Sequence, residues 1–96
     1  MNLTTEQLDK LKEMAAALLP PDEIAILLEL PPDQHGSFCE IIKNHQASPI
    51  YLAYHSGRLQ TKFELRKMVI KLAKAGSPAA QPLAEKYLIN LYQNVS

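Results

Sequence analysis

The sequence contains one cysteine, three glycines and no long hydrophobic run, and these shortages exclude whole classes of protein. Because Cys39 is alone, no disulfide can form within the chain, which excludes a disulfide-stapled secreted fold. Apolar runs such as residues 14–19 and 24–28 cover only six and five residues, whereas a membrane-spanning helix needs about 20 apolar residues. Since no leader-like segment opens the chain, we expect a cytoplasmic protein that does not enter a membrane.

With so few glycines, the spacing of the apolar residues determines the expected fold class. Apolar positions recur mostly at intervals of three and four residues, as in amphipathic helices, rather than at two, as in strands. Hydrophobic residues make up 47% of the 96 residues and charged residues 21%, a balance typical of chains that fold. We therefore expect an all-α protein, a compact bundle of five or six helices with residues 1–96 in a single domain.

The formal net charge is zero, but the two halves of the chain carry opposite charge. Residues 1–50 contain eight acidic residues and three lysines, a balance of −5. Residues 51–96 contain seven basic residues and two glutamates, a balance of +5. Such asymmetry either steers a polyanion to the basic end or draws two halves, or two subunits, together, and the sequence leaves both open.

The expected first helix begins at a capping box. Thr4 and Gln7 have the spacing at which each side chain caps the backbone N–H of the other. The apolar stripe of this helix consists of Leu8, Leu11, Ala15 and Leu18. The proline pair at residues 20–21 is expected to end it.

The second helix is expected from Pro21, because proline suits the first helical turn and two acidic residues follow it. Residues 24–28 are apolar on all sides, so a buried strand is the alternative there. A third helix, running through Ile42, begins either at Pro32 or, if the intervening glycine delays it, at Ser37.

The pair Ser48-Pro49 marks the start of a further helix, as an N-cap followed by proline at the first helical position. We expect a short helix over residues 50–56 that ends near Gly57. All three glycines, at positions 36, 57 and 76, are interpreted as helix terminators.

The longest helix is expected over residues 58–75, closed by Gly76 in the left-handed conformation. The last helix is expected over residues 77–94, where Pro82 predicts a kink or a later start. Together, residues 58–94 are expected to form a C-terminal antiparallel helix pair.

Chemistry-bearing residues are sparse. His35, His45, His55 and Cys39 do not have the spacing of a zinc site, and we expect Cys39 to be a small buried hydrophobe. No glycine-rich phosphate loop is present, and no base can be assigned to a nucleophile. The sequence therefore predicts no catalytic residue, no cofactor, no metal and no enzymatic activity.

Basic residues are the remaining signal. Lys67, Lys71 and Lys74 share one face of the expected longest helix at spacings of four and three. Lys62 shares another face of that helix with Arg58 and Arg66 at four-residue spacing, and Lys43 lies near the end of the expected third helix. An ordinary solvated helix face is the alternative to phosphate binding by these five lysines.

Residues 21–30 resemble the first half of a helix-turn-helix, in which the small Ala25 lets the recognition helix pack closely. The segment departs from the usual pattern in two places. Glu29 stands where a turn glycine is usual, and Pro31-Pro32 lengthens the turn.

Three later segments resemble the stretch found in phage terminase small subunits and related phage helix-turn-helix proteins, so that the resemblance covers roughly residues 21–90. In those proteins an Ala-Tyr and a Gly-Arg or Gly-Lys step lead into a long helix, followed by a Gly-Ser or Gly-Asp turn with alanines. The segments are Ala53-Tyr54-His55-Ser56-Gly57-Arg58, Glu64-Leu65-Arg66 and Leu72-Ala73-Lys74-Ala75-Gly76-Ser77-Pro78-Ala79-Ala80.

This resemblance implies a DNA-recognition component of a packaging motor, in a bacterial host or phage-infected cell. An N-terminal helix-turn-helix-like part, about residues 4–45, would contact viral DNA, and the later helices would assemble an oligomer. The implied partners are double-stranded DNA, a large packaging subunit and further copies of the chain.

Electrostatics oppose one part of this expectation. The expected recognition helix carries only Lys43, whereas affinity for DNA depends on neutralised phosphates. DNA contact is therefore assigned mainly to the basic residues of the longest helix, Lys62, Lys67, Lys71 and Lys74. The leading hypothesis is a non-enzymatic DNA-binding or DNA-packaging accessory protein, and the alternative is a helical protein-interaction or assembly module that does not bind nucleic acid.

Overall fold

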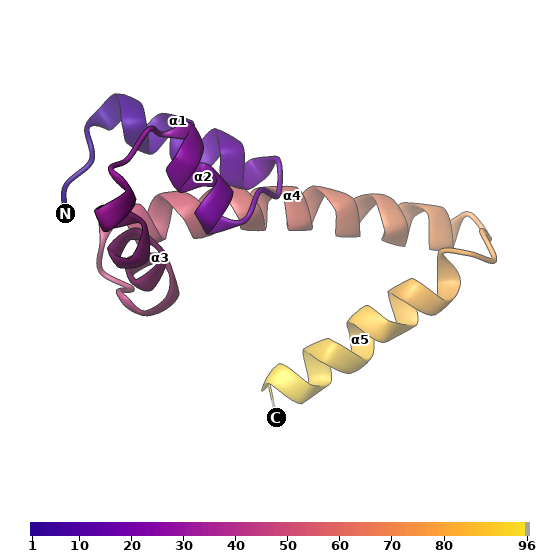
Figure 1. Cartoon of the computed structure of the whole chain (residues 1–96). Coiled ribbons are helices and arrows are strands. Elements are labelled where there is room, and N and C mark those ends of the chain that lie inside the picture. Colours follow the sequence, from indigo (N-terminus) through magenta and orange to yellow (C-terminus); the bar gives the residue numbers. More distant parts are fainter. Residues whose placement is uncertain (96) are drawn as a thin grey trace. The chain divides into compact units, whose positions relative to one another are not determined.

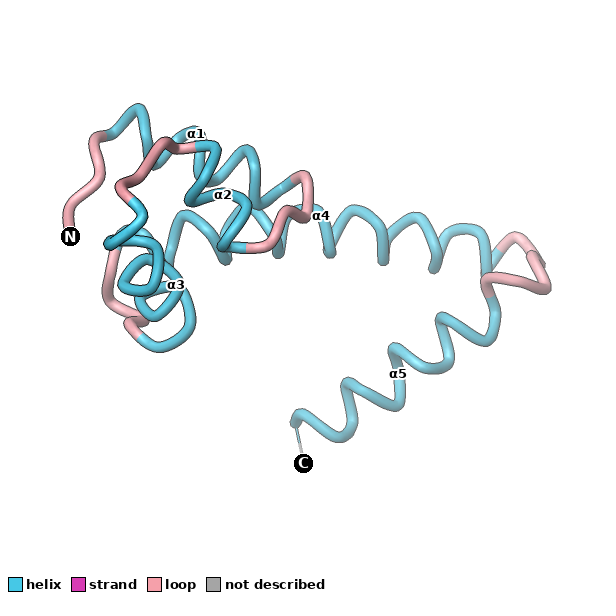
Figure 2. The backbone as a smooth tube through the Cα atoms, viewed as in Figure 1, coloured by secondary structure: helices cyan, strands magenta, loops and turns pink. Residues whose placement is uncertain are grey.

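A computed structural model of the chain describes the backbone of residues 1–95 and the side chains of residues 1–94, and it confirms the all-α fold class. Within the described residues there are five α-helices, one 3-10 turn and no strand (Figures 1 and 2). The elements are α1 (Thr5–Ala16), α2 (Pro21–Leu27), η1 (Pro32–Gln34), α3 (His35–Asn44), α4 (Pro49–Lys74) and α5 (Gln81–Val95). None of these helices, as far as the chain is described, is apolar over a length that would cross a bilayer.

The chain divides into two compact units, residues 1–61 and residues 62–96, and the boundary lies within α4. The two are called the N-terminal unit and the C-terminal unit below, and each is described by itself. That residues 1–96 act as a single domain stays a prediction.

The N-terminal unit contains the hydrophobic core. Nine buried residues from α1 to α4 form one cluster, and four of them have large side chains that are almost completely buried. These four are Leu11, Ile24, Phe38 and Ile50. In Figure 1, α1, α2 and α3 gather around the first half of α4, which supplies Ile50 to this core.

The capping box at the start of α1 is confirmed. The Gln7 backbone N–H donates to Thr4 Oγ1 at 3.1 Å, and the Thr4 N–H donates to Gln7 Oε1 at 2.9 Å. The end of this helix differs from the prediction. Leu18 lies beyond the last helical residue, with φ of 65°, and its side chain is 52% exposed, so its assignment to the apolar stripe was wrong.

Three helices end in the same way, in a Schellman motif with a left-handed residue just after the helix. After α1 the left-handed residue is Leu18, after α2 it is Glu29, and after α4 it is Gly76. In each case the next residue donates its N–H to the carbonyl five residues earlier, at 3.0–3.3 Å. Gly76 confirms the prediction, whereas the other two ends carry no glycine and could not be found by searching for one.

The α2 segment is a helix, which excludes the alternative of a buried strand. Pro21 occupies the first helical turn as predicted, and Ile24 and Ala25 enter the core. Ile26 and Leu27 remain 63% and 59% exposed, so an all-apolar stretch of sequence has one face turned to solvent.

The third helix begins before Ser37. The 3-10 turn η1 starts at Pro32 and runs directly into α3, which starts at His35. Gly36 therefore lies inside a helix, and its interpretation as a terminator was wrong.

The helix break expected at Gly57 is absent, because α4 continues from Pro49 to Lys74. Gly57 is buried where α4 crosses α1, and a Cβ atom there would run into the backbone carbonyl of Lys12 and lie 3.1 Å from the Ala16 nitrogen. One turn further on, the Thr61 hydroxyl donates to the Ala16 carbonyl. Gly57 thus permits a close helix crossing instead of ending a helix.

The later start of the last helix is confirmed. The α5 helix begins at Gln81, so Pro82 falls in its first turn, where a missing N–H leaves no helical hydrogen bond unmade. The Ser77 carbonyl accepts from the N–H groups of Ala80 and Gln81, both at 3.2 Å, and thus ends the turn that follows α4.

The Gly57 crossing can be tested with a second glycine as a matched control. We expect Gly57→Ala to lower the free energy of unfolding by about 1–3 kcal/mol, because the added Cβ forces α1 away from α4. Gly36→Ala adds the same methyl group inside α3, where nothing lies within 4 Å, and should raise it by about 0.5–1 kcal/mol. Urea unfolding followed by circular dichroism measures both. Equal effects of the two substitutions would contradict the close crossing.

Candidate interaction surfaces

The C-terminal unit has apolar side chains but hardly any core. Of its described residues, only Ala80 is buried, at 5% exposure. Ten of its large hydrophobic side chains are exposed by 39–67%. They are Phe63, Leu65, Met68, Ile70, Leu72, Leu83, Leu88, Ile89, Leu91 and Tyr92. Apolar surface of this extent on one small unit is typical of a protein–protein contact.

A groove with a volume of about 600 Å³ runs between the end of α4 and α5, entirely within the C-terminal unit. We call it the hairpin groove. Most of its lining residues are apolar or carry apolar chains, and Arg66, Lys74 and Glu85 supply charge. The apolar lining consists of Ile70, Ala73, Ala84, Leu88 and Leu91.

Arg66 crosses from α4 to the facing helix within this groove. Its guanidinium carbon lies 4.2 Å from the centroid of the Tyr87 ring, a cation–π contact that joins α4 to α5. A guanidinium that stacks on a ring by its face keeps N–H donors at its edge for a carboxylate. The groove therefore combines apolar contact with a held positive charge.

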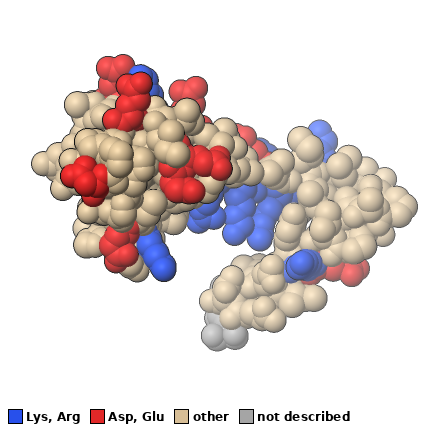
Figure 3. All heavy atoms as spheres, viewed as in Figure 1, with Lys and Arg blue, Asp and Glu red and all other residues tan. Residues whose placement is uncertain are grey.

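Four of the five predicted site lysines lie on α4 in the C-terminal unit. Lys62, Lys67, Lys71 and Lys74 are all exposed, and the last three share one face by their spacing. The Lys67 ammonium lies 5.1 Å from the Phe63 ring centroid. In Figure 3, basic side chains gather along α4, and acidic ones lie over the N-terminal helices. The fifth residue, Lys43, is exposed in the last turn of α3 and belongs to the other unit.

The two units carry opposite net charge, as the two halves of the sequence do, with a slightly smaller difference because Arg58 belongs to the N-terminal unit. The N-terminal unit carries eight acidic and four basic residues, a net charge of −4. The C-terminal unit carries six basic and two acidic residues, a net charge of +4. The chain therefore combines an acidic N-terminal unit with a basic C-terminal unit whose apolar side chains are largely exposed.

Two histidines have structural contacts that the sequence did not reveal. His55 Nε2 donates to the Ile42 carbonyl at 2.9 Å, and Arg58 donates to His55 Nδ1 at 3.3 Å. His35 Nε2 donates to the Leu30 carbonyl at 2.8 Å. Both rings are half-buried and satisfy backbone carbonyls next to helix ends, whereas His45 is exposed. Long-range contacts such as that from α4 to α3 leave no periodic signal in a sequence.

Cys39 is half-buried in α3, next to the contact between His55 of α4 and Ile42 of α3. Burial, and secondarily the negative charge of Asp22, raise the pKa of its thiol above the usual 9.0. A raised pKa disfavours the thiolate, which is the nucleophilic form. Among the described residues, no three of His, Cys, Asp and Glu come together in a way that could hold a metal ion.

No family model, curated protein or solved structure matches the chain. The resemblance to terminase small subunits therefore remains a prediction.

The pKa of Cys39 predicts its reactivity. We expect its alkylation by iodoacetamide to increase with pH along a titration whose midpoint lies above 9.0, because only the thiolate reacts. Asp22→Asn should lower that midpoint, since it removes a negative charge that opposes the thiolate. Glu23→Gln removes the neighbouring exposed charge and serves as control, with no change expected. A wild-type midpoint at or below 9.0 would contradict this environment.

Proposed function

We propose that the protein is a non-enzymatic assembly protein whose C-terminal unit associates with further copies of the chain. The supporting observation is the imbalance in that unit, with ten large hydrophobic side chains exposed against one buried residue among those described. Helices with apolar faces need a packing partner, and the N-terminal unit shows that this chain can bury such faces elsewhere.

Size supports the same proposal. The C-terminal unit comprises 35 residues, and chains below about 40 residues usually need a disulfide, a metal or oligomerisation to be stable. The lone cysteine lies outside this unit. These leucine and isoleucine side chains are about half exposed, so burial of each one against a second copy contributes about 1 kcal/mol, and a stable oligomer requires several such contacts.

The proposal includes two finer features of the fold. In the first, α4 and α5 form an antiparallel pair, supported by the tight turn between them and by the Arg66–Tyr87 contact. In the second, α2 and α3 form a helix-turn-helix-like unit, supported by their mutual packing and by the shared core residues Ile24 and Phe38.

Binding of double-stranded DNA, as expected of a packaging accessory protein that works with a large packaging subunit, is the second candidate function. The specific observation in its favour is the exposure of Lys62, Lys67, Lys71 and Lys74 along one helix of a unit with net charge +4. Phosphate contacts from the lysines of one copy bind DNA weakly. An oligomer would repeat these lysines and so raise the overall affinity for DNA. Lys43 on α3 would make a minor contribution.

Self-association can be tested by replacing leucines of similar exposure in the two units. Leu88→Gln/Leu91→Gln changes two groove residues that are each 53% exposed, and we expect loss of the oligomer in sedimentation velocity, at a cost of about 2 kcal/mol for each leucine. Leu52→Gln in the N-terminal unit is the control, because this residue is 57% exposed but lies outside the C-terminal unit. A wild-type chain that stays monomeric at all concentrations would contradict the proposed function.

DNA binding can be tested without altering the charges of the hairpin groove. We expect Lys62→Glu/Lys67→Glu/Lys71→Glu to abolish binding of a fluorescent duplex at low salt while the oligomer persists. In the wild type, the slope of log affinity against log salt should reflect about 0.9 for each lysine that contacts a phosphate.

The control for this triple reversal is Lys10→Glu/Lys12→Glu/Lys86→Glu, which makes the same change in charge at lysines that are also exposed. It should leave affinity nearly unchanged. If both triple variants bind duplex equally, the row on α4 is not a DNA contact. If wild type does not bind at low salt, the second candidate function is excluded.

A further inference from the structure

Acidic and basic residues are segregated along this chain beyond the difference between its units. Residues 13–42 contain six acidic residues and neither lysine nor arginine. Residues 65–84 contain four basic residues and neither aspartate nor glutamate. The first segment includes all of α2, and the second includes the end of α4 that lines the hairpin groove.

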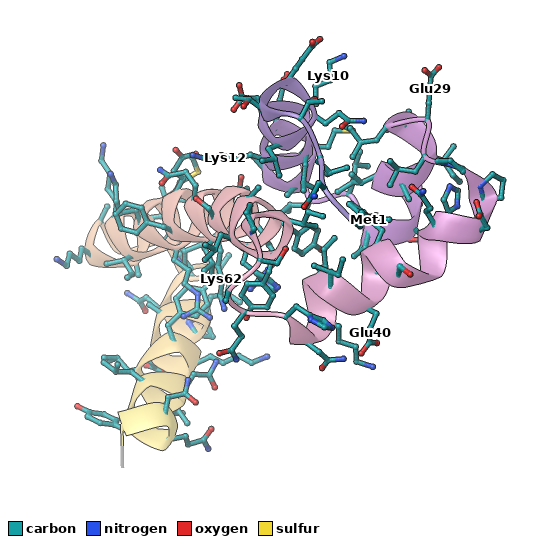
Figure 4. The ribbon with its side chains drawn as sticks, turned by 90° about the vertical axis from the view of Figure 1, so that its left-hand side faces the viewer. Met1, Lys10, Lys12, Glu29, Glu40 and Lys62 are labelled. Carbon is teal, nitrogen blue, oxygen red and sulfur yellow. The ribbon has the colours of Figure 1, made fainter. Side chains whose placement is uncertain are left out.

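Within the acidic segment, α2 presents an apolar strip bounded by carboxylates. Glu23, Ile26 and Leu27 are exposed and share one face by their spacing of three and four. Glu29 follows the helix in its left-handed turn and is exposed as well. Figure 4 shows Glu29 extending away from the helices. We call these four residues the α2 edge.

The basic residues of the hairpin groove match the α2 edge in the order of charged and apolar positions. Along α4, Arg66 and Lys74 enclose the apolar positions 70 and 73 and lie eight residues apart, about 12 Å on a helix. In the α2 edge, Glu23 precedes Ile26 and Leu27, and Glu29 follows them in the turn after the helix.

We propose that the occupant of the hairpin groove is the α2 edge of a second copy of this chain. This inference rests on the proposed self-association and adds the identity of the contacting segment. Ile26 and Leu27 lie against Ile70 and Leu88 of the other copy, and Glu23 and Glu29 pair with Arg66 and Lys74. Opposite charges at the ends of an apolar contact determine its register and exclude other registers.

Charge also disfavours the symmetric alternative, in which two grooves face each other. That arrangement brings two linings of like net charge together, and like charges across an interface are costly. Glu85 is the one acidic residue of the groove lining, which leaves the lining with a net charge of +1. Lys10 shares a shallow hollow with Leu27 and Glu29 of the α2 edge. Its ammonium forms an ion pair with the Glu6 carboxylate at 3.5 Å.

An α2 edge in a groove is a head-to-tail contact, because each copy uses a different surface on each of its two neighbours. Such contacts continue from copy to copy until they close into a ring or extend as a filament. Each copy in the interior of the assembly then has its groove filled and its α2 edge covered.

The test uses two charge-reversed variants of the full chain. The α2-reversed variant is Glu23→Lys/Glu29→Lys, and the groove-reversed variant is Arg66→Glu/Lys74→Glu. We expect each alone to weaken self-association at least tenfold in sedimentation velocity, roughly the effect of two like-charge contacts. An equimolar mixture should assemble again, since each variant's edge then meets a groove of opposite charge.

The control is Asp9→Lys/Glu13→Lys, the same change in charge at two exposed acidic residues of α1. It should assemble like the wild type. Because Arg66 also contacts Tyr87, helix content is measured by circular dichroism, and Lys74→Glu alone replaces the groove-reversed variant if the double change unfolds the hairpin.

Three results would overturn the inference. An α2-reversed variant that assembles like the control would show that α2 does not enter the groove, while self-association itself would stand. Failure of the mixture to assemble, together with rescue when all four changes are in one chain, would place the contact within a single copy. A monomeric wild type would remove the proposed function and this inference together.

Discussion

The C-terminal unit carries more apolar surface than its two helical segments bury against each other. On α4, Ile70 and Ala73 line the groove shared with α5, while Leu65, Met68 and Leu72 form a second apolar face one third of the way around the helix. A pair of helices has one mutual interface, so a second face of either helix can be covered only by something else. This constraint is the physical basis of the proposed self-association, for which the groove between α4 and α5 is the candidate surface.

The N-terminal unit meets the opposite condition. Its four helices bury a complete core, and its close α1–α4 crossing at Gly57 leaves no space between their backbones. Its charged surface is mostly acidic, and six large hydrophobic side chains are exposed as well, among them Ile26 and Leu27 of the α2 edge. An acidic unit joined through α4 to a basic unit with exposed apolar side chains provides both halves of a contact in one chain, which is why a second copy is the partner proposed for the groove.

Local signals in the sequence predicted elements well where the physics is local. Capping at Thr4 involves residues three apart, and the proline and glycine effects at positions 21, 76 and 82 act within one turn. Prediction failed at Gly57, which resembles a terminator until α1 lies against it, and at Leu18 and Glu29, which adopt a glycine-like conformation because a following leucine packs against the core or enters it. The candidate lysines could be found from spacing alone, but the groove and the His55 contacts could not.

The sequence by itself determined that the chain is helical, where most helices begin, and that its charge is divided between its ends, because these properties depend on neighbours within a few residues. Only the tertiary structure decided which apolar residues enter a core, since burial depends on partners far along the chain. Both α2 and the hairpin are rich in aliphatic residues, yet Ile24 is fully buried and Leu91 is half exposed. Helices pack by faces, and whether a face has a partner is a property of the fold and not of the segment.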